Sequence, residues 1–367
     1  MNPLYETYLS EVRAVLQHEP VLWQEEQTAA LLTLHAQQGT GALVYPSVLT
    51  LLDVSSYARA QMKSVCVSTI QNQVPLQFTL ETAWRALEKA GIHAVLMKGA
   101  GLAAFYPEPH YRSWGDIDLY VGPDQYHPAC AVMRETFPNA LKFDEELDHY
   151  KHYNLIADGI SIEVHRVTVS LQHPRDGRLY ARMEREGMAR AQELSINGLE
   201  VRVPEPTFNA LFVFLHSWEH MLSAGANIRQ LCDLALLLRH YAGSIDKPRL
   251  RRYLEDLHLM DVWQLYAYIL VQNLGFTVNE VPFYSLRSAI RAQRLLEDLL
   301  AGRMYEPKRE GSKAPKRRIA RKWFTMKGRF ATAKRISRYS PSYARHMNIT
   351  TLLHGARRFF AKDRKWE

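Results

Sequence analysis

Two aspartates separated by a single residue, Asp116 and Asp118, constrain the fold of this chain more than any other feature. They lie in DIDLYV, residues 116–121, where charged and apolar side chains alternate with the period of a β-strand. Side chains at i and i+2 point to the same side of a strand, so two like charges are brought together. A divalent cation between them would remove the repulsion, whereas a solvent-exposed strand end would tolerate it. The pair predicts a β-sheet that presents two carboxylates on one face.

A glycine-containing turn precedes this strand. The apolar run 92–97 has the length of a strand, and KGAG follows it and leads into a short helix that Pro107 ends. Gly99 and Gly101 allow a ligand to approach the backbone, and the N–H groups at a helix start attract phosphate. Lys98 adds a positive charge. The turn predicts a phosphate-binding element or, failing that, an ordinary loop.

A third acid follows in a second apolar segment. YNLIADGISIEVHRV, residues 153–167, contains two alternating runs joined through Asp158-Gly159, which predicts a β-hairpin. Glu163 lies in the second run, and His165 faces the same side two residues later. We expect Glu163 to join the two aspartates and His165 to hydrogen-bond to an acid, or else to be a packed histidine.

Three further charged residues are candidates for contact with a nucleotide. Arg112 lies four residues before Asp116, and we expect it either to reach a phosphate or to form an ion pair with the acids. Arg229 and Asp233 are four residues apart in an amphipathic helix and therefore adjacent on one helix face. Arg229 is expected to contact a triphosphate, with Asp233 orienting it, or to form a structural ion pair with Asp233.

Residues 80–245 resemble the polymerase-beta-type nucleotidyltransferase superfamily, whose signature is a glycine-containing strand–helix turn, D-x-[DE] on a strand and a third carboxylate. The segments KGAGLAAFYPEPHYRSWGDIDLYV, IEVH and HSWEHMLSAGANIRQLCDLALLL are more closely similar to the bacterial nucleotidyltransferase-like family found beside polysaccharide biosynthesis genes. The resemblance implies Mg²⁺- or Mn²⁺-dependent transfer of a nucleoside monophosphate from a nucleoside triphosphate such as ATP. The implied acceptor is a hydroxyl group, of a sugar or glycan intermediate, and pyrophosphate leaves.

The resemblance also implies roles for individual residues. It implies that three acids are catalytic and bind the metal ions, namely Asp116, Asp118 and Glu163. It implies that three residues of the turn lie against the phosphates, namely Lys98, Gly99 and Gly101. The superfamily usually has Gly or Ser directly after the first glycine, and Ala100 occupies that position here. The serine hydroxyl contact is therefore missing, or Lys98 replaces it.

Two rival interpretations remain open. HSWEH, residues 216–220, matches the inverted H-x-x-E-H pattern of zinc peptidases, which would use His216, Glu219 and His220. His216 and His220 share a helix face, as zinc ligands would, and the third ligand would be a distant Glu such as Glu297. The alternative for these histidines is a place along a cleft or in the core. A catalytically degenerate transferase that only binds nucleotide or RNA is the second rival.

The element pattern predicts an α+β fold: a small mixed β-sheet core with helices, then a helical domain. The expected division is an N-terminal helical segment (1–65), a catalytic domain (66–204), a helical domain (205–302) and a basic, aromatic tail (303–367). Residues 306–318 are expected to be a solvated linker. Three scattered cysteines, the lack of a signal-peptide pattern and the absence of an apolar run of about 18 residues favour a cytoplasmic protein.

The charge of +8 is unevenly distributed. Residues 303–367 hold 20 Lys and Arg against 4 Asp and Glu, whereas the preceding 302 residues are net acidic. Aromatic residues interleave with the basic ones of the tail. The tail is therefore expected to bind an anionic membrane surface, which would place the protein at the inner membrane face, to bind RNA, or to pack on the acidic body.

Overall fold

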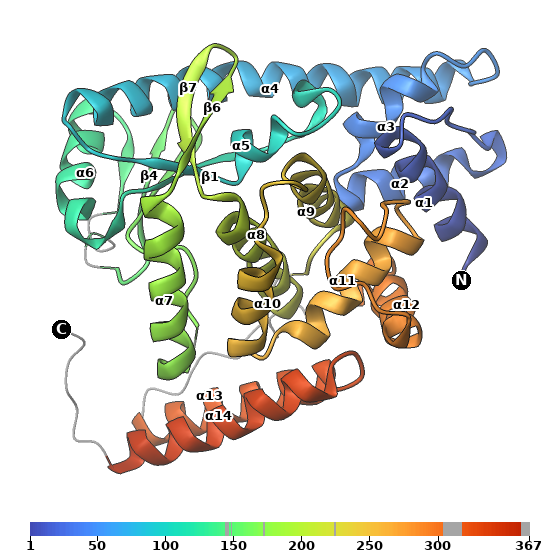
Figure 1. Ribbon diagram of the computed structural model, residues 1–367. Coiled ribbons are helices and arrows are strands. Elements are labelled where there is room, and N and C mark those ends of the chain that lie inside the picture. The colour runs from blue at the N-terminus through green and yellow to red at the C-terminus, as the bar shows by residue number, and fades with distance from the viewer. Residues whose placement is uncertain (144–146, 148, 172, 224, 304–317, 361–367) are drawn as a thin grey trace.

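The structure is a computed structural model of the 367-residue chain, and it describes residues 1–143, 147, 149–171, 173–223, 225–303 and 318–360. It has the expected α+β class, with helices predominating around a small mixed sheet (Figure 1). The helices of the N-terminal part are α1 (Pro3–Leu16), α2 (Thr28–Gln38), α3 (Gly41–Val48) and α4 (Ser56–Lys89).

The main sheet has the strand order β1-β2-β5-β4-β3. Its strands are β1 (Val95–Met97), β2 (Asp116–Tyr120), β3 (Leu141–Lys142), β4 (His152–Ala157) and β5 (Ile160–His165). Only the β2–β5 pair is parallel among the pairs in this sheet, and the others are antiparallel. The predicted strand at 116–121 and the predicted hairpin are thus confirmed, with positive φ at both Asp158 and Gly159 in the turn.

Alternation along the strands gives the sheet two different faces. The face with Ile117, Leu119, Ile162 and Val164 packs in one hydrophobic core with α4 and with α6 (Gly122–Thr136). Because side chains alternate, Asp116, Asp118 and Glu163 point to the opposite face. That opposite face is turned toward the helices that follow residue 205, here called the helical half. Met97 and Tyr120 on this face belong to the larger of the two hydrophobic cores, together with those helices.

A second hairpin was not predicted from the sequence. After α7 (Pro174–Ala189), strands β6 (Gln192–Ile196) and β7 (Leu199–Val203) pair antiparallel as a separate two-stranded sheet. Asn197 and Gly198 form its turn, both with positive φ. Asn-Gly is the strongest short-range hairpin signal, so the turn was recognisable in the sequence.

The helical half packs with the N-terminal helices in one core. It contains α8 (Pro206–Ser223), α9 (Ile228–His240), α10 (Lys247–Asp256), α11 (Met260–Gln272) and α12 (Ala289–Leu300). In the N-terminal part, α4 is a single helix of 34 residues, which Figure 1 shows spanning one side of the molecule. The boundary expected between residues 65 and 66 therefore falls inside one helix.

The basic tail forms a helical hairpin, α13 (Arg318–Ile336) and α14 (Pro341–Phe360), which lies beneath α7, α10 and α11 in Figure 1. Its turn is packed into the larger core, where Ile336 and Tyr339 are buried. The Tyr339 hydroxyl donates to Asp298 at 2.5 Å, and Ser340 donates to Asp261 at 2.6 Å. These contacts agree with the expectation that the tail packs on the body. Most of the expected linker at 306–318 lies outside the described residues.

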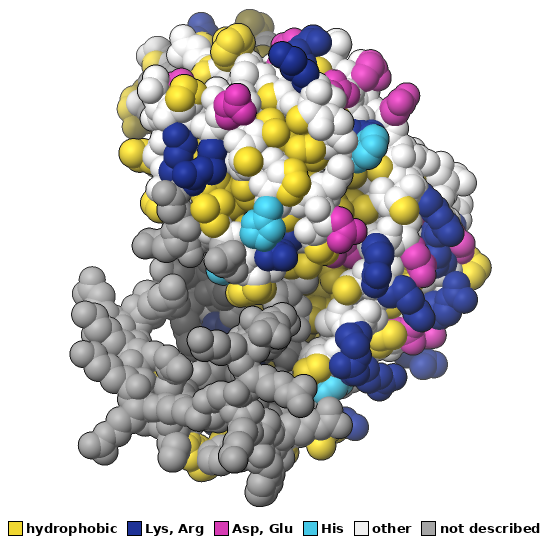
Figure 2. Space-filling model, turned by 90° about the vertical axis from the view of Figure 1, so that its left-hand side faces the viewer, with side chains coloured by type: hydrophobic (Ala, Val, Ile, Leu, Met, Phe, Trp, Pro, Cys, Tyr) yellow, Lys and Arg dark blue, Asp and Glu magenta, His cyan; other side chains and the backbone are white. Residues whose placement is uncertain are grey.

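The surface of the body carries charges of both signs. On the face in Figure 2, Lys and Arg side chains gather toward the right-hand and lower parts, with Asp and Glu among them. Within the part of the chain that the structure describes, none of the helices combines the length and the apolar character needed to cross a bilayer.

Candidate active site

The three acids converge across the parallel strand pair. Asp118 on β2 and Glu163 on β5 are direct register partners, and Asp116 is paired with Ser161. His165 Nε2 lies 3.0 Å from Oδ1 of Asp118 and 3.0 Å from Oε2 of Glu163. The two carboxylate oxygens can therefore be no farther apart than twice that distance. The predicted convergence of acids from two neighbouring strands is present in the structure.

Two cationic groups neutralise these acids in the protein alone. Lys98 Nζ lies 2.9 Å from Asp118 Oδ1, and the Asp118 side chain is fully buried. Burial alone would raise the pKa of Asp118, but Lys98 and the hydrogen bond from His165 hold that pKa well below its usual value. Burial would likewise lower the pKa of His165, and its hydrogen bonds to Asp118 and Glu163 raise it instead. His165 is thus a proton donor shared by two carboxylates, as its position in the sequence led us to expect.

Asp116 differs electrostatically from its neighbour. Burial and the nearby charge of Asp118 raise the pKa of Asp116, and Lys98 offsets only part of this increase. Burial would also raise the pKa of Glu163, but the hydrogen bond from His165 lowers it. Asp118 and Glu163 are therefore held ionised. Asp116 is easier to protonate, and added positive charge in the site would reverse this effect.

Asp116 and Glu163 open into a cleft of about 360 Å³ between the sheet and the helical half, whereas the Asp118 side chain is fully buried. Lys98, Asp116 and Glu163 contribute from the sheet side, and His216 and His220 contribute from α8. Burial, and then the charge of Lys98, lower the pKa of both α8 histidines, so they face the acids as neutral rings. The expectation that these histidines lie along a cleft opposite the sheet is confirmed.

Arg112 pairs with Asp233, which corrects the expected partnership within α9. Arg112 Nε and Nη2 donate to the two oxygens of Asp233, each at 2.8 Å, and Arg112 Nη1 donates to the Gly99 carbonyl at 3.0 Å. The Tyr106 hydroxyl donates to the same Asp233 carboxylate at 2.7 Å. This buried bidentate pair joins the turn after β1 to α9, so Asp233 orients Arg112 and not Arg229.

Arg229 lines the cleft and is hydrogen-bonded to Ser113, in the loop before β2. Its Nη1 donates to the carbonyl and, at 3.3 Å, to the hydroxyl of Ser113. Its Nε is buried and makes no hydrogen bond within the described part of the chain. The i,i+4 spacing to Asp233 suggested a partner on the same helix, but the loop before β2 provides it.

The turn after β1 has a strained backbone. Lys98 has φ of 50°, and Gly99 (φ 39°) opens the short helix α5 (Gly99–Ala103). A Cβ at Gly99 would lie 3.3 Å from the Asp116 carbonyl oxygen, so the glycine permits close contact with β2. Gly101 is different: its Cα faces Val203 of β7, and it is not among the residues that line the cleft. The expected phosphate contact of Gly101 stays a prediction.

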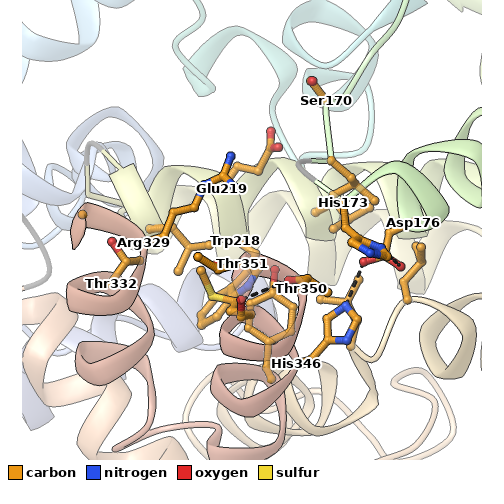
Figure 3. Close-up of a pocket in the computed structure, with 18 of the residues that line it drawn as sticks. Ser170, His173, Asp176, Trp218, Glu219, Arg329, Thr332, His346, Thr350 and Thr351 are labelled. Carbon is orange, nitrogen blue, oxygen red and sulfur yellow. Dashed lines mark hydrogen bonds and ion pairs between the residues drawn. The ribbon is translucent and has the colours of Figure 1, made fainter. Parts of the chain in front are cut away.

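The geometry does not favour the zinc-peptidase interpretation, because among the described residues His216, Glu219 and His220 do not belong to a group of potential metal ligands. The His216 and His220 rings meet edge to face, with centroids 4.5 Å apart. Glu219 lines a second cavity, of about 510 Å³, on the side of α8 that faces α7 and the tail hairpin (Figure 3). In that cavity, His346 points toward Asp176 at 2.8 Å. Glu297, the proposed third ligand, lies on α12, 3.8 Å from the Met1 nitrogen. Glu219 is thus not on the face that the two histidines share.

The sequence analysis missed residues of the strand next to Glu163. His152 on β4 is the register partner of His165, and His152 and Lys151 both line the cleft. His149, His152 and the acids come together because β4 runs antiparallel to β5. The sequence feature that could have indicated these residues is the H-x-x-H spacing of residues 149–152, directly before an alternating strand.

Comparison with known proteins identifies a family. None of the curated proteins matches the chain. Among solved structures, an antigenic nucleotidyltransferase-like protein from Paracoccidioides brasiliensis is similar at 16% identity, covering 48% of this chain and 86% of its own, with a TM-score of 0.31. Residues 24–275 match the family described as uncharacterised nucleotidyltransferase. This match spans more than half of the sequence and includes the acids, the turn and the cleft-lining helices, so the chain belongs to that nucleotidyltransferase family.

Proposed function

We propose that the protein is a Mg²⁺-dependent nucleotidyltransferase that transfers a nucleoside monophosphate from a nucleoside triphosphate to a hydroxyl acceptor. The observation that carries the proposal is the register of Asp118 with Glu163, which brings acids of two parallel strands together. Glu163 and Asp116 line the same cleft. Membership of a nucleotidyltransferase family supports the same reaction class.

The residues present fit a hard divalent cation. Oδ2 of Asp118 is buried and has no hydrogen-bond partner among the described residues, although its other oxygen is bonded twice. An orphaned buried carboxylate oxygen is costly unless a ligand completes it. Asp116, Asp118 and Glu163 would hold Mg²⁺ or Mn²⁺ through oxygen, the ligand type that these ions prefer. When bound, the metal would stabilise charge on the attacking and leaving oxygens of an in-line displacement.

The protein's own contribution is to position the substrates. In the proposed complex, Lys98 and Arg229 would contact the phosphates, because both are cationic and both line the cleft. Arg112 is fully engaged by Asp233 and the Gly99 carbonyl, so it would fix the turn that carries Lys98 and would not itself bind phosphate.

The acceptor is proposed to be a small hydroxyl compound such as a sugar or a glycan intermediate. A cleft of about 360 Å³ lies in the size range of small-molecule sites. His165 and Glu163 share a proton on the β5 side of the cleft, so an acceptor hydroxyl placed there would have a carboxylate available to take its proton.

Pyrophosphate release tests the proposal. The purified protein would be incubated with each of the four labelled nucleoside triphosphates, Mg²⁺ and a panel of sugar and sugar-phosphate acceptors. We expect Asp116→Asn and Asp118→Asn each to reduce the rate more than about 100-fold, because each removes charge from the metal site. Asp124→Asn, at an exposed position on α6, is the matched control and should leave the rate unchanged. Wild-type rates in both active-site variants would refute the proposed role of the acids.

The same experiment separates a transferase from a degenerate binding protein. Saturable binding of a labelled triphosphate or of RNA, without release of pyrophosphate across the acceptor panel, would identify a protein that binds but does not transfer. Release of pyrophosphate with label in a new product would establish transfer and identify the acceptor class.

A further inference from the structure

A group of potential metal ligands lies beside the three acids. His152 on β4 and Glu163 and His165 on β5 each offer a ligand atom, and these atoms all lie within 4.8 Å of one another. Asp116 is not in this group. Two of the three donors are imidazole nitrogens, so the chemistry of this set differs from that of an all-carboxylate magnesium site.

We propose that His152, Glu163 and His165 bind a divalent transition-metal ion of the Zn²⁺ class. His165 Nε2 lies 3.0 Å and His152 Nδ1 lies 3.8 Å from the same oxygen, Oε2 of Glu163. Ligands that share one ion at about 2.1 Å lie about 3–3.5 Å apart, so only a small movement of His152 would close the site.

The orientation of His165 is that of a metal-binding histidine. Its Nδ1 faces the Val167 carbonyl at 3.3 Å, so Nδ1–H donates to the backbone. Such a bond to the far nitrogen fixes the ring and leaves Nε2 as the nitrogen that meets an ion. Nε2 is directed at two carboxylate oxygens, and binding of a metal there would release the proton that Nε2 otherwise shares with them.

His152 provides an independent observation. Its Nδ1 is buried and makes no hydrogen bond within the described residues, yet it faces a carboxylate. The side chain is 23% exposed and lies on the wall of the cleft, so an ion has a path to it from solvent. The His149 ring lies 5.4 Å from the His152 ring, centroid to centroid. A water, an acceptor hydroxyl or His149 would complete the coordination.

The donor set predicts which ions bind. Two imidazoles and one carboxylate are a common ligand set for Zn²⁺, and imidazole nitrogen is a poor ligand for Mg²⁺. The site shares Glu163 with the proposed magnesium ligands and lies on the β5 side of the cleft. There the ion would lower the pKa of an acceptor hydroxyl; this role rests on the proposed function, whereas the binding of the ion does not.

Metal binding to the full-length protein tests the inference without nucleotide. The chelator-treated protein would be titrated with Zn²⁺ and with Mg²⁺ by calorimetry, and with Co²⁺ by visible absorption. We expect one Zn²⁺ to bind at least 100-fold more tightly than Mg²⁺. His152→Ala should weaken Zn²⁺ binding by 10- to 100-fold, and His152→Asp, which keeps an oxygen ligand, should retain a site but reduce the preference for Zn²⁺ over Mg²⁺.

Two controls make the result decisive. His346→Ala alters a different histidine–carboxylate cluster, at the second cavity, and should leave Zn²⁺ binding unchanged. Asp116→Asn should abolish transfer but keep the Zn²⁺ site, so failure of the proposed function and failure of this inference give different results. Equal Zn²⁺ affinity in wild type and His152→Ala, loss of the site in His346→Ala, or no preference for Zn²⁺ over Mg²⁺ would each overturn the inference.

Discussion

Lys98 and Asp118 form an almost fully buried ion pair, with Nζ and Oδ1 2.9 Å apart at the end of a strained strand–helix turn. Removal of one partner of a buried pair leaves an uncompensated charge, which is strongly destabilising. We therefore expect Lys98→Met to lower the free energy of unfolding by about 3 kcal/mol, as measured by urea denaturation. Lys89→Met, at an exposed position of α4, is the matched control.

The same variant reports on cation binding at Asp118. In Lys98→Met, His165 still lies beside the buried carboxylate of Asp118, but the charge of Lys98 is gone. A divalent cation could replace that charge. Millimolar Mg²⁺ should therefore raise the melting temperature of Lys98→Met more than that of wild type. Equal stability of the Lys98 and Lys89 variants would show that the pair contributes little to the fold.

Asp233 is the second buried charge whose loss should be costly. Asp233→Asn keeps the shape of the side chain but leaves the Arg112 guanidinium, only 6% exposed, without its carboxylate partner. The free energy of unfolding should fall by about 3–5 kcal/mol. Arg112→Lys should also destabilise, because an ammonium group cannot make the two parallel hydrogen bonds.

An exposed ion pair provides the comparison for Asp233. Arg85 and Glu81 pair on the surface of α4 at 2.7 Å, and Arg85→Ala should cost less than about 0.5 kcal/mol. Chemical denaturation of the three variants side by side measures the difference. Similar losses at Arg85 and at Asp233 would contradict the structural role assigned to the buried pair.

Local patterns in the sequence predicted the parts of the site that strands impose. The i,i+2 spacing put Asp116 and Asp118 on one face, and the Asp158-Gly159 turn predicted the hairpin whose second strand carries Glu163. The parallel pairing that places Glu163 beside Asp118 is a long-range contact, which the family resemblance implied and the local pattern did not. Partners that depend on tertiary packing were not predictable in this way. Asp233 pairs with Arg112, which is 121 residues away in the sequence, whereas the helix spacing predicted a pair with Arg229. A local pattern carries no information on which helix packs against the turn.

Gly187 on α7 tests the packing of α7 against α8. A Cβ at this position would lie 2.3 Å from Cβ of Phe208, a fully buried residue on α8. Alanine normally stabilises a helix by about 1 kcal/mol relative to glycine, but here the overlap forces two helices apart. We expect Gly187→Ala to lower the free energy of unfolding by about 1–3 kcal/mol.

Gly243 is the control for that substitution, because a Cβ there meets no atom within 4 Å. Gly243→Ala should therefore change the melting temperature little, and differential scanning calorimetry of the two variants gives the comparison. Equal melting temperatures of the two variants would mean that α7 and α8 are not packed as closely as described.

Glu11 and His35 should make stability depend on pH through a buried hydrogen bond of 2.8 Å in the N-terminal helices. Burial raises the pKa of Glu11 from 4.5 to about 8 and lowers that of His35 from 6.5 to about 3. The folded pair thus keeps one proton between about pH 3 and about pH 8. From pH 4.5 to 6.5 the unfolded chain also holds one proton on these two groups, so stability is flat there.

Above pH 6.5 the unfolded chain has released that proton while the folded pair retains it, so stability falls as the pH rises toward 8. The loss is about 1.4 kcal/mol per pH unit, or about 2 kcal/mol over this window. Glu11→Gln removes the titrating carboxyl and should abolish the fall, whereas Glu88→Gln, at an exposed position of α4, should preserve it. Urea denaturation at pH 6.5 and pH 8 measures both slopes. An unchanged fall in Glu11→Gln would assign the pH dependence to other groups.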